Sequence, residues 1–275
     1  MEEKTKGDLI VIGGHEDKQG DREILTEVAR RAKRGPLLMI TVATQQPKQM
    51  GEEYTKVFRE LGVKQVEVLD IRTRDDAGDE ANVAKIKDAA VIFFTGGDQL
   101  RITSQIGDSP TFRCLRDRYR QGTTIVGTSA GAAAMPDTML IDGENDKSNK
   151  ISALSMAPGL ALLPGVVIDS RFAERGRMGR LLGAVAQNPK NLGIGIDEDT
   201  AIVVRCGEHF RVLGSGAVYV ADGRGVSYSS LSEKKPEGIV SIFDIKLHVL
   251  GKDDRFDLRS REPELAESEQ QEIEK

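Results

Sequence analysis

Ser129 lies between two glycines in the segment VGTSAGAAAM, residues 126–135, at the spacing G-x-S-x-G. An apolar run precedes it and small helix-forming residues follow. This is the sequence form of a nucleophile elbow, a sharp strand-to-helix turn that exposes a serine hydroxyl. A serine is a poor nucleophile unless a base, most often histidine, takes its proton. The chain has three histidines, His15, His209 and His248, so the candidates for that base are few.

Two backbone amides are candidates for an oxyanion hole beside this serine. Gly127 and Gly131 lack the Cβ atoms that would clash in a tight turn, and the amide of Ala130 would then point at an oxyanion formed beside Ser129. The second amide would come from Gly97, in the segment TGGD. The alternative is a glycine-rich turn that carries an inert serine.

Three acidic residues follow a later apolar run in GIGIDEDTA, at positions 197–199. We interpret Asp197 and Asp199 as solvated turn residues. For Glu198 the alternative to a solvated turn residue is an acid that orients a catalytic base.

Four arginines occur close together in RFAERGRMGRLL, residues 171–182. Arginine binds carboxylates with two parallel hydrogen bonds, so the segment could form a subsite for an acidic substrate. A solvated, charged helix face explains the same pattern equally well.

The elements that must position these residues follow from the hydrophobic pattern. Short apolar runs, among them DLIVIGG, LLMITVAT, VEVLDI, AVIFFTGG and TTIVGTSA, alternate with amphipathic stretches such as DREILTEVARRAK and MGEEYTKVFRELG. This alternation is typical of βαβ units and a parallel sheet covered on both faces. The later runs have glycine breaks that favour antiparallel hairpins closing one edge. We therefore predict an α/β fold: a three-layer sandwich with a mostly parallel central sheet, helices on both faces, and antiparallel hairpins near the C-terminal part.

The candidate residues fall where strands of this sheet end. Residues 13–18, 95–99, 129, 169–171 and 197–199 each follow an apolar run. Ligands of open α/β sheets bind beyond the carboxyl ends of the strands, where the loops converge. We predict one α/β domain over residues 1–260, and an acidic, disordered tail over residues 261–275 because that segment has almost no apolar residues to bury.

These segments together resemble cyanophycinase and, more widely, the serine dipeptidase clan that includes aspartyl dipeptidase. The stretches that carry the resemblance are IGGHEDK, REIL, VLDIR, FFTGGDQLR, GTSAGAAAM, GVVIDSRFAERGRMGRLL and NLGIGIDEDTA. Cyanophycin is a poly-aspartate chain with an arginine on each side-chain carboxylate. Members of the family cut it from one end into β-aspartyl-arginine dipeptides.

The resemblance implies roles for individual residues. Ser129 would be the nucleophile, Glu198 would orient the base, and Gly97 and Ala130 would supply the oxyanion amides. The groove for the polymer would be lined by Gln99, Asp169, Ser170, Arg175, Arg177 and Arg180.

One departure from the family pattern affects the catalytic base. The family reads D-x-H-F where this chain has Asp169, Ser170, Arg171 and Phe172, so Arg171 stands in the position of the base histidine. An arginine stays protonated near neutral pH and cannot act as a base. We expect Arg171 to form an ion pair with Glu198, because a buried guanidinium needs a carboxylate.

Three hypotheses for the function follow. In the first, the protein is a serine exopeptidase acting on cyanophycin or β-aspartyl peptides, with His15 as an alternative base; His15 also fits a loop histidine that contacts substrate or solvent. In the second, it is a non-catalytic homologue that binds a β-aspartyl or acidic peptide. In the third, it is an ordinary α/β-hydrolase with the order Ser129, Glu198 and then His209 or His248. We favour the first, with its activity left open by Arg171.

Composition limits the other possibilities. Lys and Arg number 39 against 44 Asp and Glu, a net charge of −5, which argues against nucleic acid as a partner. No apolar run approaches the roughly 18 residues that span a bilayer, and we expect a cytoplasmic protein that does not bind membranes. The two cysteines, Cys114 and Cys206, have no metal-ligand spacing. We expect no metal or cofactor, a cyanophycin or β-aspartyl peptide substrate, and a homodimer.

Overall fold

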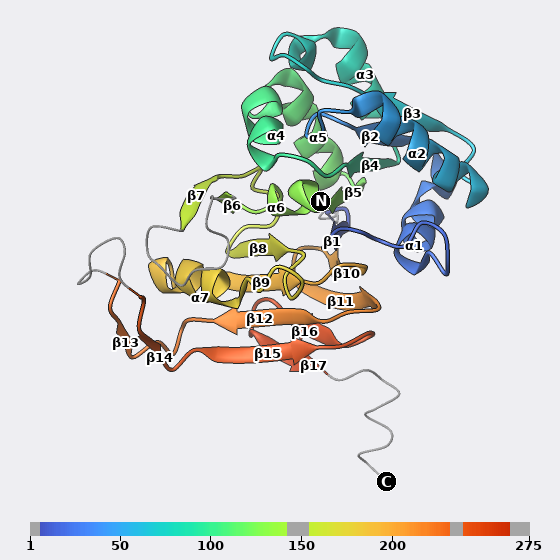
Figure 1. The fold of residues 1–275 in the computed structure, drawn as a ribbon. Helices are drawn as coiled ribbons and strands as arrows, with labels where there is room; N and C mark the ends of the chain where they lie inside the picture. Colours follow the sequence, from blue (N-terminus) through green and yellow to red (C-terminus); the bar gives the residue numbers. More distant parts are fainter. Residues whose placement is uncertain (1–5, 142–153, 232–238, 265–275) are drawn as a thin grey trace, which may run out of the picture.

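The computed structural model describes residues 6–141, 154–231 and 239–264. Within these ranges the main sheet has nine strands in the order β17-β16-β11-β10-β1-β5-β4-β2-β3 (Figure 1). Its parallel strands are β1 (Leu9–Ile12), β2 (Leu37–Ile40), β3 (Val66–Leu69), β4 (Val91–Phe94) and β5 (Thr124–Thr128). Antiparallel pairs extend the sheet beyond β1 with β10 (Thr200–Arg205), β11 (His209–Gly214), β16 (Arg255–Asp257) and β17 (Glu262–Glu264).

A second sheet has the order β15-β12-β9-β8. Its strands are β8 (Val166–Ser170), β9 (Leu192–Ile196), β12 (Val218–Asp222) and β15 (Lys246–Leu250). Two short pairs complete the described strands: β6 (Thr138–Ile141) with β7 (Ser155–Pro158), and β13 (Tyr228–Ser229) with β14 (Ile242–Phe243).

Helices cover the main sheet on both faces. The helices on one face are α1 (Glu23–Arg31) and α2 (Pro47–Glu60). The opposite face has α3 (Glu80–Asp88), α4 (Gln99–Ile106), α5 (Pro110–Arg120) and the short α6 (Ala130–Ala133). The helix α7 (Met178–Gln187) packs on the second sheet, and two 3-10 helices span Ala32–Arg34 and Asp76–Gly78.

The strand β1 is a continuous apolar run, and its side chains are buried on both faces of the sheet. Ile10 and Ile12 pack with α1 and α2, while Leu9 and Val11 belong to the core on the opposite face. All four side chains are fully buried. A strand in the middle of a covered sheet needs apolar residues at every position, and the expected three-layer α/β sandwich is confirmed over the parallel strands.

The segment 192–205 differs from the expectation of hairpins at the edge of one sheet. It divides into β9 in the second sheet and β10 in the main sheet. Asp199 turns the chain between them with a left-handed φ of 47°. The second sheet packs on the same core as the antiparallel strands, through Ile168 and Ile194 among others, and so takes the place of a helical layer there.

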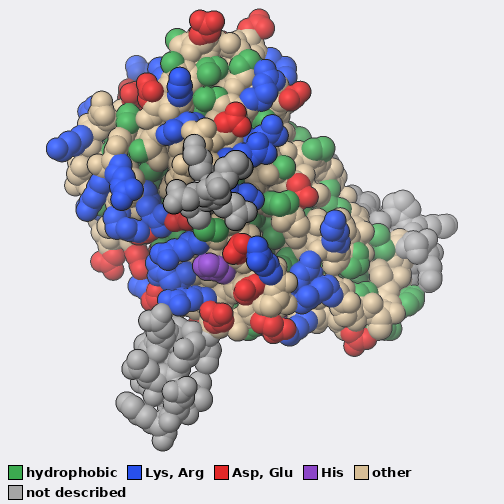
Figure 2. Space-filling model, turned by 180° about the vertical axis from the view of Figure 1, so that it is seen from behind, with side chains coloured by type: hydrophobic (Ala, Val, Ile, Leu, Met, Phe, Trp, Pro, Cys, Tyr) green, Lys and Arg blue, Asp and Glu red, His purple; other side chains and the backbone are tan. Residues whose placement is uncertain are grey.

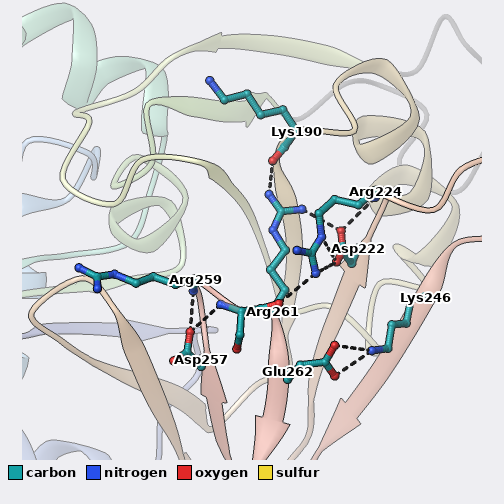
Figure 3. Close-up of polar contacts among 9 residues, drawn as sticks. Lys190, Asp222, Arg224, Lys246, Asp257, Arg259, Arg261 and Glu262 are labelled. Atoms are coloured by element: carbon teal, nitrogen blue, oxygen red, sulfur yellow. Dashed lines mark hydrogen bonds and ion pairs between the residues drawn. The ribbon is translucent and has the colours of Figure 1, made fainter.

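Ion pairs near the C-terminal strands connect the two sheets (Figure 3). Arg261 Nη1 lies 2.7 Å from Asp222 Oδ1 on β12, and Lys246 Nζ on β15 lies 2.8 Å from Glu262 Oε2 on β17. Residues 262–264 belong to the tail that we expected to be disordered, but they pair with β16 as β17. The rest of that tail, residues 265–275, lies outside the described residues. Basic and acidic side chains are interspersed over the face seen in Figure 2.

In the part of the chain that the structure describes, no helix is long and apolar enough to cross a membrane. The cytoplasmic location and the homodimer stay predictions.

Gly131 offers a test of the packing around the β5–α6 turn. A Cβ atom there would lie 2.6 Å from the carbonyl oxygen of Phe94 and 2.8 Å from its Cβ. Overpacking of this kind destabilises by about 1–3 kcal/mol, so Gly131→Ala should lower the free energy of unfolding by that amount in urea denaturation. At Gly78 no atom lies within 4 Å of an added Cβ, and Gly78→Ala should leave stability within about 0.5 kcal/mol. Equal effects of the two substitutions would contradict the close approach at Gly131.

Candidate active site

Ser129 occupies the turn between β5 and α6 in a strained backbone conformation. Its φ is 52° and its ψ is −109°, a region that non-glycine residues adopt only when the surrounding structure imposes it. The Ser129 amide donates to the carbonyl of Ile12 at 3.0 Å, and α6 begins at Ala130. A Cβ on Gly127 would lie 2.5 Å from the carbonyl carbon of Gly131. The expected sharp turn at Ser129 is confirmed, and it needs both glycines.

Gly97 and Ala130, whose amides we predict to form an oxyanion hole, line the same pocket as Ser129. Gly97 has a φ of 147°, and a Cβ there would lie 2.2 Å from the carbonyl oxygen of Ala43, so only glycine fits. A Cβ on the neighbouring Gly96 would lie 3.9 Å from Ser129 Oγ. Among the described residues, neither Gly97 nor Ala130 donates its amide hydrogen to a backbone carbonyl. Both N–H groups are therefore available to a ligand oxygen.

The loop after β1 is fixed by backbone hydrogen bonds to two other loops. The Gly13 amide donates to Thr200 at 2.9 Å, and the Gly13 carbonyl accepts from the Arg171 amide at 3.0 Å. The Gly14 carbonyl accepts from the Asp199 amide at 2.9 Å. These bonds bring the ends of β1, β8 and β9 together at one place.

Glu198 contacts His15 in this arrangement, and the expected ion pair between Glu198 and Arg171 is not what the structure has. Glu198 Oε1 lies 3.0 Å from His15 Nδ1. Arg171 Nη1 lies 3.5 Å from the other ring nitrogen, His15 Nε2. The amide of Asp199, which follows Glu198, donates to the carbonyl of Gly14, which precedes His15, and this bond brings Glu198 and His15 together. The Arg171 guanidinium contacts the other nitrogen of the ring.

The stem of Arg171 lies beside the serine. A Cβ on Gly14 would lie 3.2 Å from Ser129 Cβ and 3.4 Å from Arg171 Cγ, so the two side chains flank the same glycine. Arg171 itself has a left-handed φ of 51°, and its Nε is buried with no hydrogen-bond partner among the described residues. The stem of Arg171 thus lies near Ser129, and its guanidinium reaches His15.

All six residues predicted to hold substrate line one pocket with the serine. Its lining includes Gly97, Gln99, Ser129, Ala130, Asp169, Ser170, Arg171, Arg175, Arg177 and Arg180. His15 and Glu198 are not part of this lining and meet it through Arg171. The buried amide of Gln99 is occupied by the carbonyl of Leu140, to which its Nε2 donates at 2.9 Å.

Three of these charged residues form a buried ion cluster. Arg177 Nη1 donates to Asp169 Oδ1 at 2.8 Å and to the Ser170 carbonyl at 3.0 Å. Arg180 Nε lies 3.4 Å from Asp169 Oδ2, and all three charged side chains are almost completely buried. The cluster thus places two guanidinium groups beside the Asp169 carboxylate in the wall of the pocket.

A buried carboxylate behind the serine was missed by the sequence analysis. Glu16 accepts from Thr128 Oγ1 at 2.7 Å and also from the hydroxyl of Tyr54. Burial, together with the adjacent Glu16, raises the pKa of the Tyr54 hydroxyl well above its usual value. Glu16 thus fixes the residue immediately before Ser129. Its place in IGGHEDK was visible in the sequence, but its partners come from β5 and α2 and were not.

The interpretation of Asp197 as a solvated turn residue is wrong, whereas Asp199 does lie in a turn and is half-buried. Asp197 is buried, and its two carboxylate oxygens accept from the amides of Ala173 at 2.9 Å and Ala217 at 3.1 Å. Burial raises the pKa of Asp197. Asp199 Oδ1 accepts from the Asp17 amide at 2.8 Å. Both carboxylates join loops on either side of Glu198.

The other two histidines lie elsewhere. His209 pairs with Arg205, at the end of β10 opposite to Thr200, which contacts the site loop. His248 pairs with Val220 within β15, and its ring contacts Phe256 at 5.6 Å between centroids. The hypothesis of an ordinary α/β-hydrolase with one of them as base therefore has no support in the fold.

Residues 9–213 match the model of the family described as peptidase family S51. A cyanophycinase from Geminocystis herdmanii is 36% identical over 266 residues, which are 96% of this chain and 98% of that protein. A cyanophycinase from a Nostoc species is 38% identical over 260 residues, 94% of this chain and 87% of that one.

Solved structures have the same fold. The crystal structure of a peptidase from an acI-B1 Actinobacterium aligns with a TM-score of 0.64 at 20% identity, over 89% of this chain and 98% of that chain. At that identity the likeness concerns the fold.

The buried cluster around Asp169 generates a prediction on stability. Asp169→Asn keeps the side-chain shape but removes the charge that compensates Arg177 and Arg180. Removing one partner of a buried pair costs about 3–5 kcal/mol, and urea denaturation should show that loss. As a matched control, Asp108→Asn disrupts an exposed pair with Arg113, separated by 3.8 Å, and should leave stability unchanged. An Asp169→Asn protein as stable as the wild type would contradict the cluster's structural role.

Proposed function

Because the chain belongs to peptidase family S51, we propose that it is a serine-type exopeptidase that cleaves cyanophycin or β-aspartyl peptides. Ser129 is the nucleophile in this proposal. The observation that carries it is the strained turn at Ser129, next to two amides with no backbone acceptor among the described residues. The near full-length similarity to cyanophycinases supports the choice of substrate.

The geometry suits acyl transfer. Ser129 Oγ attacks the substrate carbonyl carbon, and the carbonyl oxygen becomes an oxyanion. The N–H groups of Gly97 and Ala130 stabilise that negative charge as it develops. The amine leaves, and water then hydrolyses the acyl-enzyme.

The arginines on the pocket lining support the choice of substrate. Each arginine of cyanophycin retains a free α-carboxylate, and Arg175 lies on the lining, where a guanidinium binds a carboxylate with two hydrogen bonds. Arg177 and Arg180, held by Asp169, contribute positive charge from behind.

A second candidate function is binding of a β-aspartyl or acidic peptide without cleavage. In its favour, Arg171 stands where the resemblance places the catalytic base, and its Nη1 lies 3.5 Å from His15 Nε2. The pocket and the oxyanion amides serve a binding protein equally well, so measured turnover separates the two functions.

The first activity prediction concerns the nucleophile. The wild-type protein should release β-aspartyl-arginine from cyanophycin, measured by mass spectrometry. Ser129→Ala should lower turnover by at least about a thousandfold, because removal of the nucleophile removes the covalent route. Ser104, exposed on α4, provides the control, and Ser104→Ala should keep full activity. Wild-type protein that binds the polymer without releasing product would favour the second candidate function.

The second activity prediction concerns substrate binding. Arg175→Ala should raise KM by roughly five- to a hundredfold, since a charged hydrogen bond contributes about 1–3 kcal/mol. The control is Arg113→Ala, which changes an arginine on α5 outside the pocket lining and should leave KM as it is. If both variants had the wild-type KM, Arg175 would be no more than a surface charge.

A further inference from the structure

The main chain immediately before His15 lies against the nucleophile. It directly follows Gly14, whose added Cβ would lie 3.2 Å from Ser129 Cβ. The φ of His15 is 49°, a left-handed conformation that is uncommon for residues with a side chain. The hydrogen bond from the Asp199 amide to the Gly14 carbonyl holds this conformation and brings in the neighbouring Glu198.

The contact with Glu198 determines which ring nitrogen can act as a base. An ionised carboxylate only accepts hydrogen bonds, so at 3.0 Å from Glu198 Oε1 the Nδ1 atom of His15 carries the proton. The neutral ring then presents a lone pair at Nε2. A carboxylate on Nδ1 and an unprotonated Nε2 are the arrangement by which an acid orients a catalytic histidine. Glu198 is itself positioned by its amide, which donates to Glu174 Oε1 at 3.1 Å.

The contact with Arg171 also agrees with a lone pair at His15 Nε2. A guanidinium only donates, so Arg171 Nη1 faces the lone pair of His15 Nε2. The separation of 3.5 Å is longer than an ordinary N–H···N or N–H···O hydrogen bond, and the contact is correspondingly weak. A carboxylate of a bound ligand is a better partner for the guanidinium, and Arg171 lies on the pocket lining where such a ligand would bind.

We propose that His15 is the general base of this protein, oriented by Glu198, and that a substrate carboxylate draws Arg171 away from His15 Nε2. In this proposal the base lies in the loop after β1, whereas the resemblance places it in the segment after β8. This inference rests on the proposed peptidase function. It explains how a chain with Arg171 where the resemblance places the base can still activate Ser129, through His15 and Glu198.

The proton transfers balance through one histidine. As Ser129 Oγ bonds to the substrate carbonyl carbon, its proton passes to His15 Nε2, and Glu198 stabilises the imidazolium. His15 gives that proton to the leaving nitrogen as the C–N bond breaks. It then takes a proton from water, which attacks the acyl-enzyme, and returns it to Ser129 Oγ when the ester bond breaks.

The experiment compares turnover and KM of cyanophycin cleavage for the wild type, His15→Ala, His15→Gln and Arg171→Ala, with His209→Ala as the matched histidine control. The side chain of His15 is 65% exposed, so both His15 variants should fold, which circular dichroism and binding of β-aspartyl-arginine check. We expect both to lose about a hundred- to ten-thousandfold in turnover, with partial recovery of His15→Ala in added imidazole. Arg171→Ala should raise KM more than it lowers turnover, and His209→Ala should match the wild type.

The possible results separate this inference from the proposed function. An active wild type whose His15 variants stay within tenfold of it overturns the role of His15 and leaves the peptidase function intact. An inactive wild type together with an active Arg171→His variant also overturns it, since Arg171 would then disable a site that needs a histidine at position 171. If neither the wild type nor Arg171→His cleaves the polymer, the inference and the proposed function both fail.

Discussion

The rest of the site depends on the strained backbone of Ser129. A φ of 52° with a ψ of −109° is imposed by the hydrogen bond from the Ser129 amide to Ile12, across the parallel pairing of β1 and β5. The same pairing places the loop after β1 against the serine. Strain of this kind persists only where its surroundings over-determine it. Here the close approach of Gly127 to Gly131 and the buried Glu16 beneath Thr128 do so.

The segment 192–205 is divided between the two sheets, and this division positions Glu198. The chain leaves β9 in the second sheet, passes through residues 197–199, and enters β10 beside β1. Asp197 and Asp199 anchor this crossing through hydrogen bonds to three backbone amides, those of Ala173, Ala217 and Asp17. Glu198, between them, therefore meets the loop that carries His15. The second sheet thus contributes to the candidate site as well as to the core.

The sequence predicted the local elements and the edge of the sheet on which they converge. Apolar runs that must be buried on both faces identified β1, β2, β4 and β5, and the G-x-S-x-G spacing identified the turn at Ser129. These features depend on the local order of residue types, which a single sequence contains.

Features that depend on distant pairings were not predictable in the same way. The break at Asp199 assigns β9 to a different sheet from β10, and nothing local in GIGIDEDTA distinguishes that from a continuous hairpin. The partner of Glu198 depends on the hydrogen bond between Asp199 and Gly14, which brings His15 to Glu198 from the end of another strand. The expected pair with Arg171 was therefore wrong. Glu16 could be seen in the sequence, but its burial follows from Tyr54 on α2 and Thr128 on β5.

The most direct test is a crystal structure of the protein inhibited by a phosphonate analogue of a β-aspartyl peptide that retains its α-carboxylate. We expect phosphorus bonded to Ser129 Oγ and a phosphonyl oxygen about 2.7–3.1 Å from the amides of Gly97 and Ala130. We also expect Arg171 on the ligand carboxylate, and His15 Nε2 within hydrogen-bond distance of Ser129 Oγ or the leaving-group position. An adduct in which Arg171 still covers His15 Nε2, or no adduct on Ser129 at all, would contradict these expectations.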